Sequence, residues 1–136
     1  MKTYIIGFFV TLLTTLVLDG IWLSTMLKTF YAKNFSGVLE MKSSLTPAII
    51  FYIIYTLGVL YFVVLPLLNA QTSYLTVFLT GAFFGLVAYG TYDLTNHATI
   101  KNWPAIVTIV DLAWGAFLTG TVATVTVWII RLFKLM

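Results

Sequence analysis

Long apolar runs alternate with short polar stretches along the whole chain. Four runs, residues 4–27, 47–68, 74–97 and 104–130, each reach about the 20 residues that an α-helix needs to cross a bilayer. The connections at residues 69–73 and 98–103 are so short that the helices they join lie antiparallel. The pattern therefore predicts an all-α membrane protein, a single domain over residues 1–136. Its four transmembrane helices form a compact bundle with both termini on the same side.

Composition supports the same class of protein. Hydrophobic residues make up 61% of the 136 positions and charged residues only 8%, whereas a soluble domain carries about 25% charged residues. The net charge of +3 comes from basic residues scattered over span ends and loops, so no nucleic-acid partner is expected. The absence of cysteine excludes disulfides, thiolate metal sites and thiol nucleophiles.

Small residues recur at four-residue spacing on two of the predicted spans. Gly81 and Gly85 form one such pair, and Ala116, Gly120 and Thr124 form a longer ladder. Spacings of this kind predict that the helices approach one another closely.

Three of the four acidic residues, Asp19, Asp93 and Asp111, interrupt the apolar runs, and no Lys or Arg lies in the same runs. A carboxylate at mid-helix costs roughly 2.5–3.5 kcal/mol on insertion scales. Counted from the ends that meet at the first and third loops, all three lie roughly 6–12 Å deep at the rise of an α-helix. This common depth on three helices predicts one shared intramembrane site, held by protonation, a bound cation or a wet cavity.

Neighbouring polar and aromatic residues share helical faces with these aspartates. On the third span, polar side chains recur at the spacing of one face and lead toward the membrane surface. On the first and fourth spans, a tryptophan follows each aspartate by three residues. The predicted ligand-binding residues are Asp19, Trp22, Tyr89, Asp93, Asn96, His97, Asp111 and Trp114, and no catalytic residue is assigned.

A divalent metal on these groups is a weaker interpretation. Three carboxylates and the imidazole of His97 suit such an ion chemically. However, di-iron bundles use paired Glu-x-x-His motifs, whereas Asp93-x-x-x-His97 occurs once. Phosphate-binding loops and dinucleotide fingerprints are also missing. We therefore predict no metal site and no cofactor.

Four segments resemble a known family: LDGIW at 18–22, YGTYDLTNHAT at 89–99, KNWP at 101–104 and VDLAWG at 110–115. Over nearly its whole length the chain is similar to small bacterial membrane proteins grouped as DUF2177, a domain of unknown function. The resemblance implies a four-helix, multi-pass protein of the bacterial inner membrane. It implies no assigned activity and supplies no catalytic roles.

The residues favour a pocket that binds or transports a small cationic or amphipathic ligand, with a carboxyl proton exchanging for the ligand. One alternative is a membrane-embedded enzyme that acts on a lipid or isoprenoid by Asp/His acid–base chemistry. Another is a non-catalytic structural or assembly subunit. Whether the protein is an enzyme stays open here. The expected partners are membrane lipids, the ligand, and a second copy in a homodimer, because one four-span chain is small for a carrier.

Overall fold

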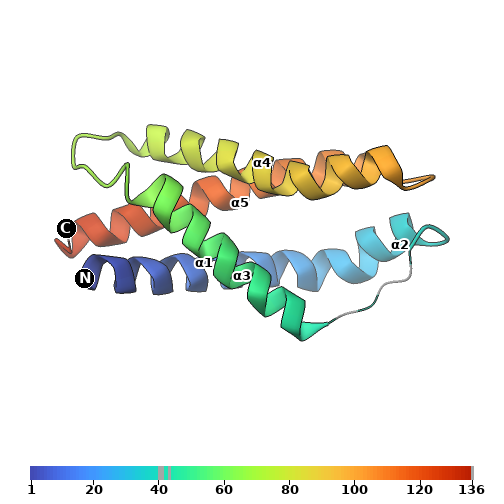
Figure 1. Cartoon of the computed structure of the whole chain (residues 1–136), viewed down its shortest axis with the longest axis horizontal. Coiled ribbons are helices and arrows are strands. Elements are labelled where there is room, and N and C mark those ends of the chain that lie inside the picture. The colour runs from blue at the N-terminus through green and yellow to red at the C-terminus, as the bar shows by residue number, and fades with distance from the viewer. Residues whose placement is uncertain (40–41, 43, 136) are drawn as a thin grey trace.

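The computed structural model describes every residue except 40, 41, 43 and 136. Its helices run in the order α1 (Lys2–Met26), η1 (Leu27–Tyr31), α2 (Ala32–Phe35), α3 (Leu45–Val59), η2 (Leu60–Val64), α4 (Tyr74–Thr99) and α5 (Ala105–Leu132). Because α1, η1 and α2 are continuous, and α3 continues into η2, these helices form four rods (Figure 1). Each rod is long and apolar enough to cross a membrane. The predicted all-α class with four spans is confirmed.

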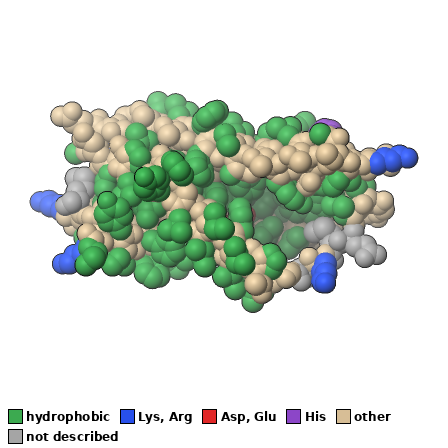
Figure 2. Space-filling model, viewed as in Figure 1, with side chains coloured by type: hydrophobic (Ala, Val, Ile, Leu, Met, Phe, Trp, Pro, Cys, Tyr) green, Lys and Arg blue, Asp and Glu red, His purple; other side chains and the backbone are tan. Residues whose placement is uncertain are grey.

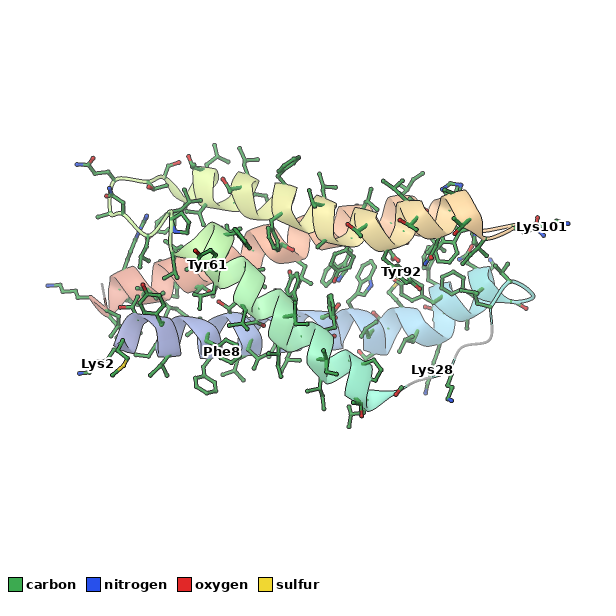
Figure 3. The ribbon with its side chains drawn as sticks, in the orientation of Figure 1. Lys2, Phe8, Lys28, Tyr61, Tyr92 and Lys101 are labelled. Carbon is green, nitrogen blue, oxygen red and sulfur yellow. The ribbon has the colours of Figure 1, made fainter. Side chains whose placement is uncertain are left out.

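The rods pack as one bundle around α5. α4 lies along α5, α1 packs against α5 as well, and α3 crosses α1 at an angle before η2 reaches α4 and α5 (Figure 1). Both termini lie at one end of the bundle (Figure 1), where the Thr3 hydroxyl donates a hydrogen bond to the Leu135 carbonyl. Lys28 and Lys101 mark the opposite end (Figure 3). We call these the terminal end and the loop end.

The first rod extends further than the apolar run predicts. Hydropathy alone ends this span near residue 27, at the lysines of the following segment, but the helix continues through a π-helical turn to Phe35. The extension is amphipathic: Tyr31 and Phe35 are buried whereas Lys28 and Lys33 stay exposed. Burial of the two rings stabilises this helical extension. Its lysines lower the hydropathy of the segment, so the sequence pattern there is typical of a loop.

The other three rods differ from their predicted ranges by a few residues. The second runs over Leu45–Val64, the third over Tyr74–Thr99 and the fourth over Ala105–Leu132. The second ends four residues before the predicted position 68, in turns that surround Pro66. Proline has no amide hydrogen to donate within a helix, so it favours the end of a helix here.

Glycines allow α4 and α5 to touch backbone to backbone. A Cβ atom on Gly85 would lie 2.0 Å from the Gly115 carbonyl oxygen, and one on Gly81 would lie 2.8 Å from that of Thr119. The close approach predicted from the glycine pair is therefore present. Of the ladder predicted on the fourth span, only Gly120 is among the atoms nearest these two glycines.

The terminal half of the bundle is a filled core. Aliphatic side chains from α3, η2, α4 and α5 meet there with almost no exposed surface. They include Val59, Val63, Val64, Val77, Leu118, Val122, Val127 and Ile130.

Arg131 ties the connection between η2 and α4 to the end of α5. Its guanidinium donates hydrogen bonds to the carbonyl oxygens of Leu67 at 3.1 Å and Thr72 at 2.9 Å, and also to that of Asn69. The same group lies 5.1 Å from the centre of the Tyr74 ring. Carbonyls beyond a helix end lack intrahelical partners, so this side chain supplies donors that the backbone does not.

Arg131→Lys is expected to loosen this connection. A lysine has one point-like ammonium in place of the planar fork, so the loss of two or more hydrogen bonds lowers the free energy of unfolding by about 2 kcal/mol. Hydrogen exchange of the amides over residues 67–73 should accelerate. Lys2→Gln, at an exposed position of the same end, is the control. Unchanged exchange in Arg131→Lys would show that the guanidinium contributes nothing there.

Candidate functional site

A cavity of about 440 Å³, open on one side, lies between the rods in the loop half of the bundle. We call it the carboxylate cavity, and Figure 2 shows the hollow to the right of centre, bordered by hydrophobic side chains. Aliphatic and aromatic side chains form most of its wall, and none of its described lining residues is basic. The lining residues are Leu23, Leu27, Tyr31, Phe35, Phe51, Ala88, Tyr89, Tyr92, Asp93 and Asp111.

Asp93 has no hydrogen-bond donor in the part of the chain that the structure describes. The residue is 1% exposed, and both of its carboxyl oxygens are buried without a partner. It lines the carboxylate cavity together with Asp111. A buried polar group that lacks a partner costs about 1–3 kcal/mol, and more when it is charged. This carboxyl therefore requires a donor, which is either a proton shared with the neighbouring Asp111 carboxyl or a group that a ligand brings.

Asp111 is held in place by two aromatic side chains in series. The Tyr31 hydroxyl donates a hydrogen bond to Asp111 Oδ1, and the indole Nε1 of Trp22 donates to the Tyr31 oxygen at 3.0 Å. Because the indole supplies the donor on one side, the phenol hydrogen is directed to the carboxylate on the other. Of the two carboxyls in the cavity, one is therefore oriented by the protein and one is not.

Asp19 belongs to a supporting layer behind the cavity. Tyr52 donates to its Oδ2, Trp114 Nε1 donates to its Oδ1 at 3.1 Å, and its carboxyl does not line the cavity. The rings of Trp22 and Trp114 stack at 4.3 Å with 7° between their planes. This stack joins the hydrogen bonds of Asp19 to those of Asp111, so the two aspartates share one aromatic scaffold.

Tyr89 reaches the cavity because α5 has a glycine beneath it. A Cβ atom on Gly115 would lie 2.4 Å from the Tyr89 ring, and Tyr89 lines the wall beside Asp93. Any larger residue at position 115 would displace this ring.

Asn96 and His97 lie outside the cavity wall. His97 is exposed, and its Nδ1 lies 3.3 Å from the hydroxyl oxygen of Thr108, which also accepts a hydrogen bond from Trp103 at 3.0 Å. Among the described residues, no three Asp, Glu or His side chains converge as a metal site requires.

The structure therefore divides the eight predicted site residues into three groups. Those that line the cavity are Tyr89, Asp93 and Asp111. Those in the hydrogen-bonded and stacked layer behind it are Asp19, Trp22 and Trp114. Those outside the wall are Asn96 and His97.

Comparison with protein families places this chain in a known group. The family described as "Predicted membrane protein (DUF2177)" matches residues 4–128, a range that includes all ten lining residues of the carboxylate cavity. The chain belongs to the DUF2177 family. The resemblance recognised in the four sequence segments is thus confirmed. Searches of curated proteins and of solved structures found no significant match.

Seven of the ten wall residues of this DUF2177 protein were not predicted from sequence, and four of these seven lie near or beyond the expected end of the first span. Leu23 and Leu27 end the apolar run, and Tyr31 and Phe35 follow in the segment interpreted as a loop. Their spacing of four residues is that of one helical face. This periodicity was the available signal, and the intervening lysines obscured it.

Tyr31→Phe should destabilise the DUF2177 bundle. The change removes the phenol that donates to Asp111 and accepts from Trp22, leaving both groups short of a partner. The free energy of unfolding should fall by about 1–3 kcal/mol, as measured by denaturant unfolding in detergent micelles. Tyr61→Phe, at an exposed ring on η2, should change it by less than about 0.5 kcal/mol. Equal stability of the two variants would exclude a role for the Tyr31 hydroxyl in holding Asp111.

Proposed function

We propose that this DUF2177 protein binds a small amphipathic ligand with a cationic head group, and that it does so within the bacterial inner membrane. The head group contacts Asp93 and Asp111, and the apolar part lies among the leucines and rings of the carboxylate cavity. The observation that carries the proposal is Asp93, whose two buried oxygens face no donor from the described chain.

An ammonium group fits the chemistry of this wall. It brings hydrogen-bond donors to Asp93 and positive charge to a wall with two carboxyls and no described basic residue. The rings of Tyr31 and Tyr89 line the same space, and aromatic faces attract cations when water is excluded. A neutral donor such as an alcohol satisfies fewer of these groups, and an anion is repelled.

The size and polarity of the cavity favour an amphipathic molecule. Its volume of about 440 Å³ lies within the range of small-molecule sites, about 300–1,000 Å³. Apart from the carboxyls and phenols, its wall consists of aliphatic and aromatic groups. Burial of an alkyl chain there is favourable by roughly 0.8 kcal/mol per methylene relative to water.

Binding is better supported than transport in this conformation. A carrier exposes its site to the second side of the membrane, but the terminal half of the bundle is filled by side chains such as Val63, Val122 and Val127, each at most 1% exposed. Transport by proton exchange at the carboxyls therefore requires those rods to separate. The binding step proposed here does not depend on that rearrangement.

The enzyme alternative loses one of its expected groups. Acid–base chemistry with an imidazole requires His97 near the ligand, and His97 lies outside the cavity wall. An enzyme built on this cavity would depend on Asp93 and Asp111 alone. Recovery of chemically unchanged ligand after long incubation argues for binding, whereas a modified product argues for the enzyme.

The test compares three single-chain probes that differ only in their head group. Wild-type protein in phosphatidylcholine nanodiscs is titrated with dodecylammonium, dodecanol and dodecanoate, and binding is followed by the unfolding temperature. Dodecylammonium at about 100 times its dissociation constant should raise the free energy of unfolding by about 2.7 kcal/mol. The affinity for dodecanol should be lower by a factor of about ten or more, and dodecanoate should not raise the unfolding temperature of the protein. Stabilisation by dodecanoate equal to that by the ammonium would contradict a cation site.

A further inference from the structure

The two ends of the carboxylate cavity along the bundle axis are closed by packed side chains. Toward the loop end stands an aromatic cluster in which Tyr31, Phe35 and Trp103 are each at most 8% exposed. Phe35 and Trp103 lie 5.1 Å apart by their ring centres. Toward the terminal end lies the aliphatic core of α3, η2, α4 and α5. A ligand that moves along the bundle axis meets packed side chains in both directions.

The open side of the cavity is marked by the lining residues that remain exposed. Leu27 is 41% exposed, Phe51 46% and Tyr92 56%, and they belong to the first rod, to α3 and to α4. We call these three residues the rim. Figure 3 shows Tyr92 on α4, between that helix and the first rod in this view. The three rim residues belong to three different candidate membrane spans, so the opening lies on the side of the bundle and not at either of its ends.

The tilt of α3 creates this opening. The first half of α3 crosses α1 and diverges from α4, whereas η2 packs against α4 and α5 (Figure 1). In that first half most residues are exposed, and Phe51 is its one contribution to the described cavity wall. Farther along, the rings of Phe62 and Phe84 stack at 6.3 Å and close the space between the same two rods.

We infer that the ligand reaches Asp93 sideways from the bilayer, through the opening between α3 and α4, and is therefore a membrane-dissolved, single-chain amphiphile with an ammonium head group. This inference rests on the proposed function and adds the route and the source of the ligand. The head group passes the rim to the carboxyls, and the chain remains among apolar groups throughout. A drug-sized cavity accommodates a head group and part of one chain.

A removable cross-link over the rim tests the route. The chain has no cysteine, so Phe51→Cys with Tyr92→Cys introduces one pair, which a bifunctional thiol reagent with a reducible centre can join. The matched control joins Phe62→Cys and Phe84→Cys, a pair between the same two rods where they already touch. The probe is bromine-labelled dodecylammonium in nanodiscs, with quenching of tryptophan fluorescence as the readout.

Cross-linking the rim should slow association of the probe by about tenfold or more, and reduction should restore the original rate in the same protein. Cross-linking after the probe is bound should trap it and slow its dissociation. The control cross-link should leave both rates unchanged.

Association at the original rate through a cross-linked rim would overturn lateral access while leaving the binding proposal intact. Failure of the wild-type protein to bind the probe at all would overturn the binding proposal, and the inferred route with it. The two failures are thus distinguished by the wild-type measurement alone.

Discussion

Asp93→Asn is expected to weaken dodecylammonium binding by at least about 2 kcal/mol, roughly thirtyfold in the dissociation constant. The side chain keeps its shape but loses its charge, and its amide hydrogens then face the donors of the ammonium. The measurement is a titration of wild-type and variant protein in nanodiscs, with the probe at increasing mole fraction in the bilayer.

An apolar residue at position 93 is expected to raise the free energy of unfolding although it abolishes ligand binding. Asp93→Leu replaces a buried carboxyl that has no described partner by a side chain suited to the aliphatic wall, and the cavity beside it offers space. The free energy of unfolding should rise by about 1–3 kcal/mol while binding is lost. Such an exchange of stability for function is typical of a residue retained for its ligand.

Asp19→Asn is the matched control for both measurements. This carboxyl accepts from Tyr52 and Trp114 and does not line the cavity. Its replacement should therefore lower stability by about 1–3 kcal/mol and change the dissociation constant by less than about threefold. If Asp93→Leu also destabilised the protein, Asp93 would have a structural role, and the result would favour a structural or assembly subunit over a ligand-binding protein.

Gly85→Ala is expected to have the largest effect on folding. Its new Cβ would lie 2.0 Å from the Gly115 carbonyl oxygen and 2.5 Å from Thr119 Oγ1, so α4 and α5 would have to move apart along their contact. The cost is about 3 kcal/mol or more, because backbone cannot give way as a flexible side chain does. Unfolding of the variant in detergent, compared with wild type, gives this value directly.

Gly90→Ala on the same helix is the control, because it replaces a glycine by alanine without a steric clash against α5. A Cβ atom there has its nearest neighbour at 3.6 Å, at the end of the Leu94 side chain, which is an ordinary contact. Since alanine favours a helix over glycine by about 1 kcal/mol, this variant should equal or exceed wild-type stability. Similar losses at both positions would mean that the close approach of α4 and α5 is not what Gly85 supports.

Two of the three aspartates placed by their depth along the helices, Asp93 and Asp111, line the candidate site, and the third, Asp19, does not. Residues on three spans at a similar distance from the loop end were expected to converge, and Asp93 and Asp111 do line one cavity. Helical periodicity also related Tyr89 to Asp93 on the same face. It carried the same argument to His97, one turn further, but that side chain lies near the end of α4 and faces Thr108 of α5 instead. Depth and residue spacing are properties of a single helix. They do not reveal how that helix is rotated relative to its neighbours.

The four spans could be read from the amino-acid sequence, because hydrocarbon offers backbone groups no hydrogen-bond partners except those within a helix. An apolar run of about 20 residues therefore forms a helix that crosses the membrane. Which aspartate lacks a hydrogen-bond partner among the described residues depends on how the helices pack. Contact of Gly85 with Gly115 sets the rotation of α4 against α5. In the stacked pair, Trp114 donates to Asp19 and Trp22 donates to Tyr31. The tilt of α3 opens the side of the bundle. These features arise from packing between distant segments, and that packing leaves the Asp93 oxygens without a described hydrogen-bond partner on the wall of the carboxylate cavity.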